Sequence, residues 1–305
     1  MESRKEFPIK LYCMTTDALN DPETFRKHYL EMPEGRRAKI DRVRMEQDKK
    51  LSLAAGILLD RGLQEFNLSG KTIRIEESAY GKPFFPDFPN IHFSLSHSHE
   101  MALAVFADTE VGCDIEYRKK PNEKLAGRFF CPEENAWMTA ARTETERKER
   151  FYRLWTLKES FIKATGQGLR QPLDSFCFRI EETCVLQSEM RGKTRRGNIP
   201  VEVPPRSSSA AGSPLPLRSA QNVSASLRTV LNEHPLDVQH RPLDDQRRAA
   251  HERNALRLGG AAVEIRRRNS SVEVTQIFDQ AEYVFEEYLI GGDGEYCAAV
   301  CLRSQ

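Results

Sequence analysis

The chain is 305 residues long, with 46 basic and 45 acidic side chains and 39% hydrophobic residues. This length can bury one large core or two ordinary ones. The even charge balance argues against a coat that binds nucleic acid or a membrane, and no apolar run approaches the ~20 residues that span a bilayer.

The N-terminus and the cysteines predict a cytoplasmic protein. The opening segment, MESRKEFPIK, lacks the apolar core of a signal peptide. The seven cysteines are odd in number and include no CxxC pair, which suits a reducing compartment better than a disulfide framework. We therefore expect most of them to be small core residues.

The N-terminal segment predicts a strand followed by helices. Residues 9–13 alternate between apolar and polar, which is typical of a strand. Asp21 is a suitable cap for a helix that has Pro22 at its first position. Residues 34–50 are dense in cations and run into the apolar stretch LSLAAGILL. This region is either a solvated helix face or a surface that meets a phosphate.

A turn and a serine-containing strand come next. Gly81-Lys82-Pro83 has the composition of a turn, where a lone lysine is most often exposed. Residues 91–98 alternate, so that Ser94 and Ser96 share the face opposite the apolar residues. We expect the strand to give way to a turn at His97. The histidines of this region have no spacing typical of a zinc site.

Residues 101–106 predict another strand, and residues 111–116, VGCDIE, predict one that presents two carboxylates together. Period-two alternation sends the three apolar residues of VGCDIE to one face, and Gly112, Asp114 and Glu116 to the other. The glycine lets other atoms approach closely. Two carboxylates packed away from water are unfavourable unless they are protonated or a cation lies between them.

Two short helices should meet after residue 130. Residues 128–130 are expected to end one helix, and Cys131-Pro132-Glu133-Glu134 to begin the next. Acidic side chains in a first helical turn complement the helix dipole, so Glu134 also has a purely structural interpretation.

Residues 151–169, FYRLWTLKESFIKATGQGL, predict the central helix, with apolar residues at helical spacing and glycines that favour a left-handed stop. Glu159 and Lys163 lie one turn apart within it. Such a pair is either a surface salt bridge or part of a buried site. If Glu159 faces Asp114 and Glu116, three carboxylates converge, and a hard divalent cation with oxygen ligands is the natural occupant.

Strands are predicted near the C-terminus, at 173–180, 282–290 and 295–302. Between the first two, residues 179–277 contain none of the 26 aromatic residues. Residues 191–270 hold 15 basic against 7 acidic side chains. Such a segment buries too little apolar surface to offset its ordering entropy. We predict a disordered insertion at 191–272, with a short helix near 244–258; it is a partner-docking arm, an inert linker or an intron-like segment.

The chain resembles Sfp-type 4′-phosphopantetheinyl transferases through an ordered set of motifs. These are Gly81-Lys82-Pro83, His92-Phe93-Ser94-Leu95-Ser96-His97-Ser98, residues 111–116, Arg128-Phe129-Phe130 with Glu134, and residues 151–176. A lone Asp-x-Glu is common, whereas these blocks in the family's order are specific. The chain departs from the family at Ser94, where its nearest members carry Asn, at Pro132, and at the insertion.

The resemblance implies an α+β fold of two similar halves, each a small antiparallel sheet packed on a long helix, with the active site between the halves. The N-terminal half would span residues 1–108. The C-terminal half would comprise 109–190 and 273–305, interrupted by the insertion at 191–272. We expect a monomer.

The implied activity is that of a holo-[acyl-carrier-protein] synthase. Such an enzyme transfers the 4′-phosphopantetheine group of coenzyme A to a serine of an apo acyl or peptidyl carrier protein, with Mg²⁺, and releases 3′,5′-ADP. The metal ligands would be Asp114, Glu116 and Glu159, and the catalytic residues Glu159, Lys163 and Glu134. Coenzyme A would contact Arg36, Lys39, Lys82, Pro83, Ser96, His97 and Lys163. The carrier would dock on residues 166–175, with Arg170 as a contact.

Two other function classes stay open. A non-catalytic carrier-binding relative would keep the fold, and a Mg²⁺-dependent nucleotide hydrolase would use the same acidic residues. Incubation with fluorescent coenzyme A and an apo carrier separates the three classes. The outcomes are a labelled carrier, no change, or nucleotide breakdown alone.

Overall fold

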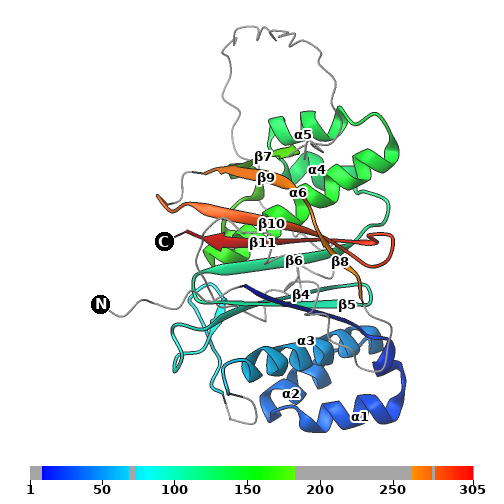
Figure 1. The fold of residues 1–305 in the computed structure, drawn as a ribbon, viewed down its shortest axis with the longest axis vertical. Coiled ribbons are helices and arrows are strands. Elements are labelled where there is room, and N and C mark those ends of the chain that lie inside the picture. Colours follow the sequence, from blue (N-terminus) through cyan, green and yellow to red (C-terminus); the bar gives the residue numbers. More distant parts are fainter. Residues whose placement is uncertain (1–8, 69–72, 183–262, 277–278, 305) are drawn as a thin grey trace, which may run out of the picture.

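The computed structural model describes residues 9–68, 73–182, 263–276 and 279–304 (Figure 1). Helices and small antiparallel sheets form layers, so the predicted α+β class is confirmed. Within the described ranges, no helix combines the length and the apolar character needed to cross a membrane.

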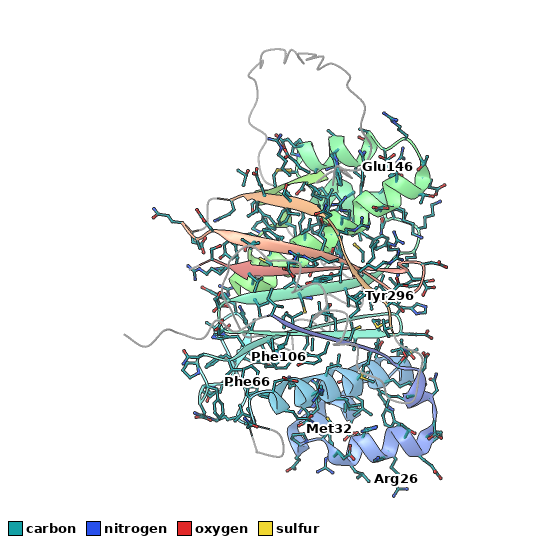
Figure 2. All side chains as sticks on the ribbon, viewed as in Figure 1. Arg26, Met32, Phe66, Phe106, Glu146 and Tyr296 are labelled. Atoms are coloured by element: carbon teal, nitrogen blue, oxygen red, sulfur yellow. A yellow bond between two sulfur atoms is a disulfide. The ribbon has the colours of Figure 1, made fainter. Side chains whose placement is uncertain are left out.

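The N-terminal sheet has the strand order β1-β5-β4 and packs on a long helix. Its strands are β1 (Lys10–Thr15), β4 (His92–Ser98) and β5 (Met101–Ala107), and its helices are α1 (Pro22–Glu31), α2 (Glu34–Arg42) and α3 (Glu46–Gln64). Asp21 caps α1 as predicted, because its carboxylate accepts from Thr24 N at 2.9 Å. Helix α3 covers one face of the sheet (Figure 1), where Phe106 of β5 lies near Phe66 (Figure 2).

The C-terminal sheet has the order β6-β11-β10-β8 and packs on α6. Its strands are β6 (Val111–Tyr117), β8 (Ile265–Arg267), β10 (Tyr283–Ile290) and β11 (Tyr296–Arg303), and its helices are α4 (Glu123–Phe129), α5 (Pro132–Thr139) and α6 (Glu144–Thr165). Smaller pairs are β2 (Glu76–Glu77) with β3 (Pro83–Phe84), and β7 (Cys177–Glu182) with β9 (Ser270–Thr275). Short 3₁₀ turns span Asp17–Asn20, Gly168–Arg170 and Leu173–Ser175, so the strand predicted from 173 begins at Cys177.

The insertion predicted for 191–272 ends earlier than expected. Residues 263–272 include β8 and the first part of β9, and Val272 packs against the core of the C-terminal half. These strands were not predicted because β8 is rich in arginine and the alternating residues of β9 are only partly buried. Residues 191–262 of the predicted insertion, and with them the helix expected near 244–258, lie outside the described residues.

Helix α6 begins seven residues before the predicted segment. Thr143 caps it by accepting from Glu146 N at 3.1 Å, and Gly166 ends it in the left-handed conformation with φ of 69°. Its first two turns are charged, which concealed them from an apolar pattern. Further along, Trp155 and Phe161 pack into the core of the C-terminal half.

The two sheets meet face to face. The apolar residues of β6, Val111, Cys113 and Ile115, are buried against β1 and β5 of the other sheet, as the alternation of VGCDIE predicted. The opposite face of β6 therefore turns Gly112, Asp114 and Glu116 toward α6. Both sheets thus converge on the strand that carries the two carboxylates.

A row of serines joins β4 to β6. Strand β6 lies at the edge of its sheet, and alternate N–H groups of an edge strand lack a neighbouring strand. The serine hydroxyls of β4 accept these hydrogen bonds. The pairs are Cys113 N to Ser94 Oγ at 2.9 Å, Ile115 N to Ser96 Oγ at 3.3 Å, and Tyr117 N to Ser98 Oγ at 3.1 Å. We call this row the serine seam.

Replacing Gly112 by alanine is expected to destabilise the protein by about 3 kcal/mol, because overpacking of a rigid contact costs this order. A Cβ at Gly112 would lie 1.9 Å from the Ser160 carbonyl oxygen of α6, so the helix must shift. Gly127→Ala is the matched control. It meets no atom within 4 Å on exposed α4 and should gain up to about 1 kcal/mol from helix propensity. Urea unfolding measures both; equal stabilities would contradict the close approach of α6 to β6.

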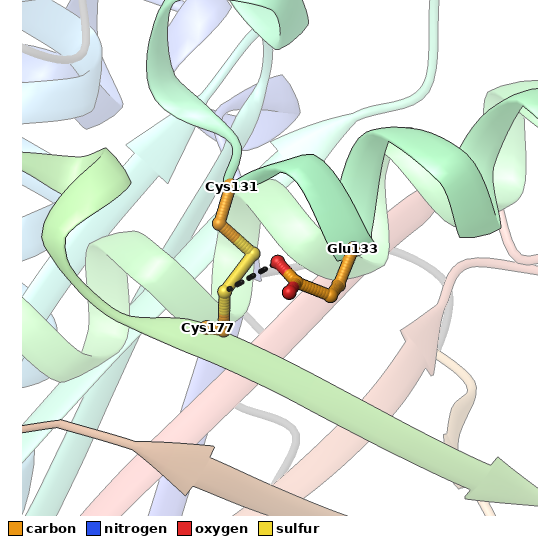
Figure 3. Close-up of side chains that lie close together, drawn as sticks. All are labelled: Cys131, Glu133 and Cys177. Carbon is orange, nitrogen blue, oxygen red and sulfur yellow. Dashed lines mark hydrogen bonds between the residues drawn. A yellow bond between two sulfur atoms is a disulfide. The ribbon is translucent and has the colours of Figure 1, made fainter. Parts of the chain in front are cut away.

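Four of the described cysteines are buried thiols, as predicted: Cys13, Cys113, Cys297 and Cys301. Cys131 and Cys177 instead form a disulfide between the start of α5 and the start of β7 (Figure 3). The sequence favoured a reducing compartment over a disulfide framework and did not predict this bridge. The residues are 46 positions apart, and only the tertiary fold brings them together.

Candidate functional site

The three predicted metal ligands lie where β6 faces α6. Asp114, Glu116 and Glu159 are 1%, 7% and 4% exposed, so each carboxylate is buried. The serine seam orients two of them. Ser96 Oγ donates to Asp114 Oδ1 at 2.8 Å, and Ser98 Oγ donates to Glu116 Oε2 at 2.7 Å. We call the surface formed by Asp114, Glu116 and Glu159 the acidic face. Strand β6 positions the backbone of Asp114 and Glu116, and the serine hydroxyls of β4 orient their carboxylates.

Lys163 is bound to this acidic face rather than to solvent. Its ammonium donates to Asp114 Oδ1 at 2.8 Å and to the Cys113 carbonyl at 2.9 Å. Burial alone lowers the pKa of Lys163, but the Asp114, Cys113 and Glu159 groups outweigh burial, so its pKa is raised. The lysine stays cationic, and its i, i+4 relation to Glu159 is not an exposed salt bridge.

Glu159 has the strongest electrostatic perturbation of the site. Burial raises its pKa, Asp114 and Glu116 raise it further, and Lys163 opposes them, which brings the pKa of Glu159 to about 8. The carboxylates of β6 and α6 thus share one electrostatic environment. Without a bound metal ion, this pKa favours the protonated form of Glu159 at neutral pH.

Two buried carboxylate oxygens lack partners. Asp114 Oδ2 and Glu159 Oε1 accept no hydrogen bond from any described residue. Orphaned oxygens in a buried acidic cluster suit a hard cation such as Mg²⁺, which prefers oxygen ligands. The three acidic residues do not bring one oxygen each within 4.8 Å of one another. Among the described residues, a set of possible metal ligands that lie this close together is formed by Cys131, Glu133 and Cys177. Metal binding therefore requires the carboxylates to draw closer.

Glu134 lies outside this acidic face, so its contacts do not support the catalytic role that the resemblance implied. Its side chain is 0% exposed and pairs with Lys158 Nζ at 2.9 Å. Its oxygens also accept from Cys131 N at 2.9 Å and from Phe178 N at 2.8 Å. Both carboxylate oxygens are therefore engaged, and the contacts of Glu134 are those of a buried core residue.

Lys158 completes this buried pair and was not singled out from the sequence. It donates to the carbonyls of Leu173 at 2.7 Å and Phe176 at 2.8 Å. Burial lowers the pKa of Lys158 and raises that of Glu134, and each partner opposes the other's shift. We call this arrangement the Lys158–Glu134 platform. Its lysine belongs to α6 and directly precedes Glu159 in the chain.

Lys82 joins the predicted turn to the end of α6. Its ammonium pairs with Glu110 and donates to the Ala164 carbonyl at 2.8 Å. Its aliphatic chain passes Gly166, where a Cβ would lie 2.8 Å from Lys82 Cδ. Pro83, the next residue, is buried in β3. Lys82 and Pro83 thus lie near the helix end that follows Lys163.

Arg36 and Lys39 lie on α2, in the N-terminal half. Arg36 packs over Gly56 of α3, where a Cβ would meet its Nε at 3.0 Å, and Lys39 lies 3.9 Å from Glu77 of β2. The Glu77 contact places Lys39 beside the hairpin that contains Pro83.

Ser96 and His97 point to opposite faces of β4. The strand continues through Ser98, so the turn expected at His97 was wrong. The Ser96 hydroxyl meets Asp114, Ile115 N and Lys163, whereas His97 shares the face of Phe93 and Leu95 that packs toward α3. The two residues therefore do not present a common surface. Ser98 lies on the same face as Ser94 and Ser96, but the turn expected at His97 kept it from being assigned there.

The loop after α6 carries an exposed contact between the halves. The Arg170 guanidinium lies 5.0 Å from the ring centre of Tyr80, which is 45% exposed. This cation–π contact places Arg170 beside the Lys82 turn.

The chain is similar in sequence to known 4′-phosphopantetheinyl transferases. A family model described as the 4′-phosphopantetheinyl transferase superfamily matches residues 110–203. The chain is 36% identical over 176 residues to 4′-phosphopantetheinyl transferase ffp of Bacillus subtilis, which covers 57% of this chain and 78% of that protein. It is 35% identical, with the same coverage, to 4′-phosphopantetheinyl transferase Sfp of Bacillus subtilis strain 168. Over 137 residues it is 31% identical to the human L-aminoadipate-semialdehyde dehydrogenase-phosphopantetheinyl transferase, covering 40% of this chain and 44% of that protein.

Proposed function

Because this chain belongs to the Sfp-type 4′-phosphopantetheinyl transferases, we propose that Asp114, Glu116 and Glu159 hold Mg²⁺ while it transfers phosphopantetheine from coenzyme A to a carrier protein. The observation that carries the metal assignment is the buried acidic face with two unpartnered carboxylate oxygens. All three ligands are oxygens, which is the donor set that Mg²⁺ prefers. When bound, the metal supplies positive charge beside the pyrophosphate.

The chain's own residues position the reactants and balance charge. Lys163, fixed by Asp114 and the Cys113 carbonyl, provides a cation beside the phosphates. The serine hydroxyl of the carrier attacks the phosphorus that bears pantetheine, and 3′,5′-ADP leaves. We assign to Glu159 the acceptance of the serine proton through a water. Phosphoryl transfer needs this positioning and charge neutralisation more than a protein nucleophile.

The contacts to coenzyme A form the second part of the proposal. Lys82 and Pro83 are supported by their place at the end of α6, next to Lys163. Ser96 acts through Asp114, since its hydroxyl is already engaged there. His97, Arg36 and Lys39 would contact other phosphates from the α2 and α3 side. Alanine variants of these three should raise KM for coenzyme A more than they lower kcat.

The carrier partner and the state of the protein complete the proposal. We place the acyl or peptidyl carrier on residues 166–175, where Arg170 and Tyr80 offer an exposed basic and aromatic surface. The enzyme would act as a monomer in the cytoplasm. The two halves, 1–108 and 109–190 with the C-terminal strands, would fold as one transferase body around the acidic face.

The direct test uses fluorescent coenzyme A and apo carrier proteins of the acyl and peptidyl types. We expect a labelled carrier with Mg²⁺ and none after chelation by EDTA, with activity returning when Mg²⁺ is restored. Nucleotide breakdown without a labelled carrier would favour a hydrolase. Undiminished labelling in EDTA would remove the metal from the proposal.

The pKa of Glu159 predicts a pH-dependent affinity for Mg²⁺. Below about pH 8 this carboxyl holds a proton that Mg²⁺ must displace. The half-saturating Mg²⁺ concentration should therefore fall by up to ~10-fold per pH unit as pH rises from about 6.5 to 8, and then level off. Calorimetry in buffers of different ionisation enthalpy should detect a released proton at pH 7. Glu159→Gln should abolish this pH dependence, and a flat profile in the unmodified protein would contradict the assignment.

Ser98→Ala is expected to raise the half-saturating Mg²⁺ concentration by ~10-fold or more, because ligands lose affinity when the group that orients them is removed. Ser98 donates to Glu116 and accepts from Tyr117 N. Ser94→Ala is the matched control, since it removes one bond of the same seam, from Cys113 N, without touching a carboxylate. Calorimetric Mg²⁺ titration of both variants decides the matter. Equal affinities would assign the seam a structural role alone.

A further inference from the structure

The disulfide between Cys131 and Cys177 lies at a structurally sensitive position. Cys131 is the N-cap residue of α5 and is 2% exposed, whereas Cys177 opens β7 and is partly exposed (Figure 3). Their Cα atoms are 5.9 Å apart, within the usual range for a disulfide. The bridge therefore has one shielded sulfur and one nearer to solvent.

Both ends of this bridge hold the Lys158–Glu134 platform. On one side, Cys131 N donates to Glu134 Oε2 at 2.9 Å. On the other side, Cys177 lies between two residues whose backbones enclose the pair. Phe176 O accepts from Lys158 at 2.8 Å, and Phe178 N donates to Glu134 at 2.8 Å. The disulfide thus joins the two backbone segments that satisfy a fully buried ion pair.

We propose that Cys131 and Cys177 form a reversible thiol–disulfide site, opened by small-molecule thiols, whose closed state locks the Lys158–Glu134 platform between α5 and α6. The covalent bond keeps the start of α5 and the start of β7 together. Once it opens, the same segments are held by core packing and by hydrogen bonds to the ion pair, without a covalent link. Because Lys158 immediately precedes Glu159, loosening the platform loosens the helix that carries a proposed metal ligand.

The exchange balances in two steps. A thiolate attacks the accessible Cys177 sulfur, the S–S bond breaks, and Cys131 leaves as a thiolate at the N-terminal end of α5, where a helix favours negative charge. A second thiolate then attacks the mixed disulfide and releases Cys177. One protein disulfide and two small-molecule thiols become one protein dithiol and one small-molecule disulfide. The two electrons come from the small-molecule thiols.

Glu133 lies close enough to the two cysteines that the reduced site could bind a metal ion instead. Its Oε2 lies 3.6 Å from Cys177 Sγ (Figure 3), and these three side chains form a group of ligand atoms within 4.8 Å. Two thiolates and a carboxylate suit Zn²⁺. Zinc capture by the reduced protein is therefore the competing outcome of the experiment.

The experiment uses the full chain with Cys184→Ser, so that the only other cysteines are the four buried thiols. The protein is equilibrated with graded ratios of reduced to oxidised glutathione, quenched, alkylated and analysed by peptide mass. We expect Cys131 and Cys177 to gain label together, and the peptides that contain them to be linked under oxidising conditions. The oxidised form should melt about 10 °C higher than the reduced form. The temperature at which half of the transferase activity survives a fixed heat exposure should differ between the two forms by the same amount.

Two variants serve as controls. Cys177→Ser should remove both the paired labelling and the difference in melting temperature. Cys131→Ser should do the same while keeping a good helix cap, so that loss of the cap is separated from loss of the bridge. The proposal is overturned if the two peptides never link, or if both redox forms melt at the same temperature. Stoichiometric Zn²⁺ binding by the reduced protein, absent in Cys177→Ser and without linked peptides after oxidation, would replace it with a metal site.

Discussion

Asp114→Asn is expected to lower the rate of phosphopantetheine transfer by ~10³-fold or more, the effect of several kcal/mol of lost charge stabilisation. The asparagine keeps the shape of the side chain but removes the charge from the centre of the acidic face, where Asp114 meets Ser96, Lys163 and an unpartnered oxygen. Steady-state transfer of fluorescent phosphopantetheine measures the loss. Asp293→Asn, at an exposed turn, is the matched control and should be unaffected.

Folding must be separated from chemistry in this variant. Removing the Asp114 charge leaves Lys163 buried without its carboxylate, and breaking one side of a buried ion pair costs about 3–5 kcal/mol. Asp114→Asn/Lys163→Met removes both charges and should recover most of this stability, while activity stays lost. A double variant that transfers at near-normal rates with Mg²⁺ would refute the metal assignment.

Lys158→Met is expected to destabilise the protein by about 3–5 kcal/mol, because it leaves Glu134 charged and unpaired at 0% exposure. Adding Glu134→Gln should restore part of that loss, since the amide oxygen can still accept one of the two backbone N–H groups. Urea denaturation gives the free energies of unfolding. Lys124→Met, on exposed α4, is the control and should change stability by less than ~0.5 kcal/mol.

The same variants test whether Glu134 takes part in catalysis. A general base that is lost costs ~10²–10⁴-fold in kcat. We expect Glu134→Gln to retain kcat within about threefold per folded molecule at low temperature, since its carboxylate is occupied by Lys158, Cys131 N and Phe178 N. A loss of ~10²-fold in fully folded protein would return Glu134 to the active site.

Local patterns predicted the acidic face correctly. The alternation of VGCDIE depends only on the geometry of one strand, so the opposite faces of Cys113 and Asp114 followed from the sequence. The close approach allowed by Gly112 followed as well, because a glycine beside carboxylates on a strand face leaves room for a helix. The cap at Asp21 rested on similarly local chemistry.

Features that depend on distant partners were missed. Glu134 had the composition of a helix start, but its role is set by Lys158, 24 residues later, and by the backbone of β7. The disulfide likewise joins segments that only the fold brings together. Strands β8 and β9 lay within an arginine-rich stretch without aromatic residues, where composition outweighed a weak alternation.

The serine seam also determines where aggregation of the protein would begin. Side-chain hydroxyls, rather than another strand's main chain, cover the outer N–H groups of β6. If the two halves separate under heat or denaturant, that row becomes a template on which a second molecule can add a strand. Aggregation is then expected to start at β6, and substitutions that weaken the seam should bring precipitation on at milder stress before enzyme function declines.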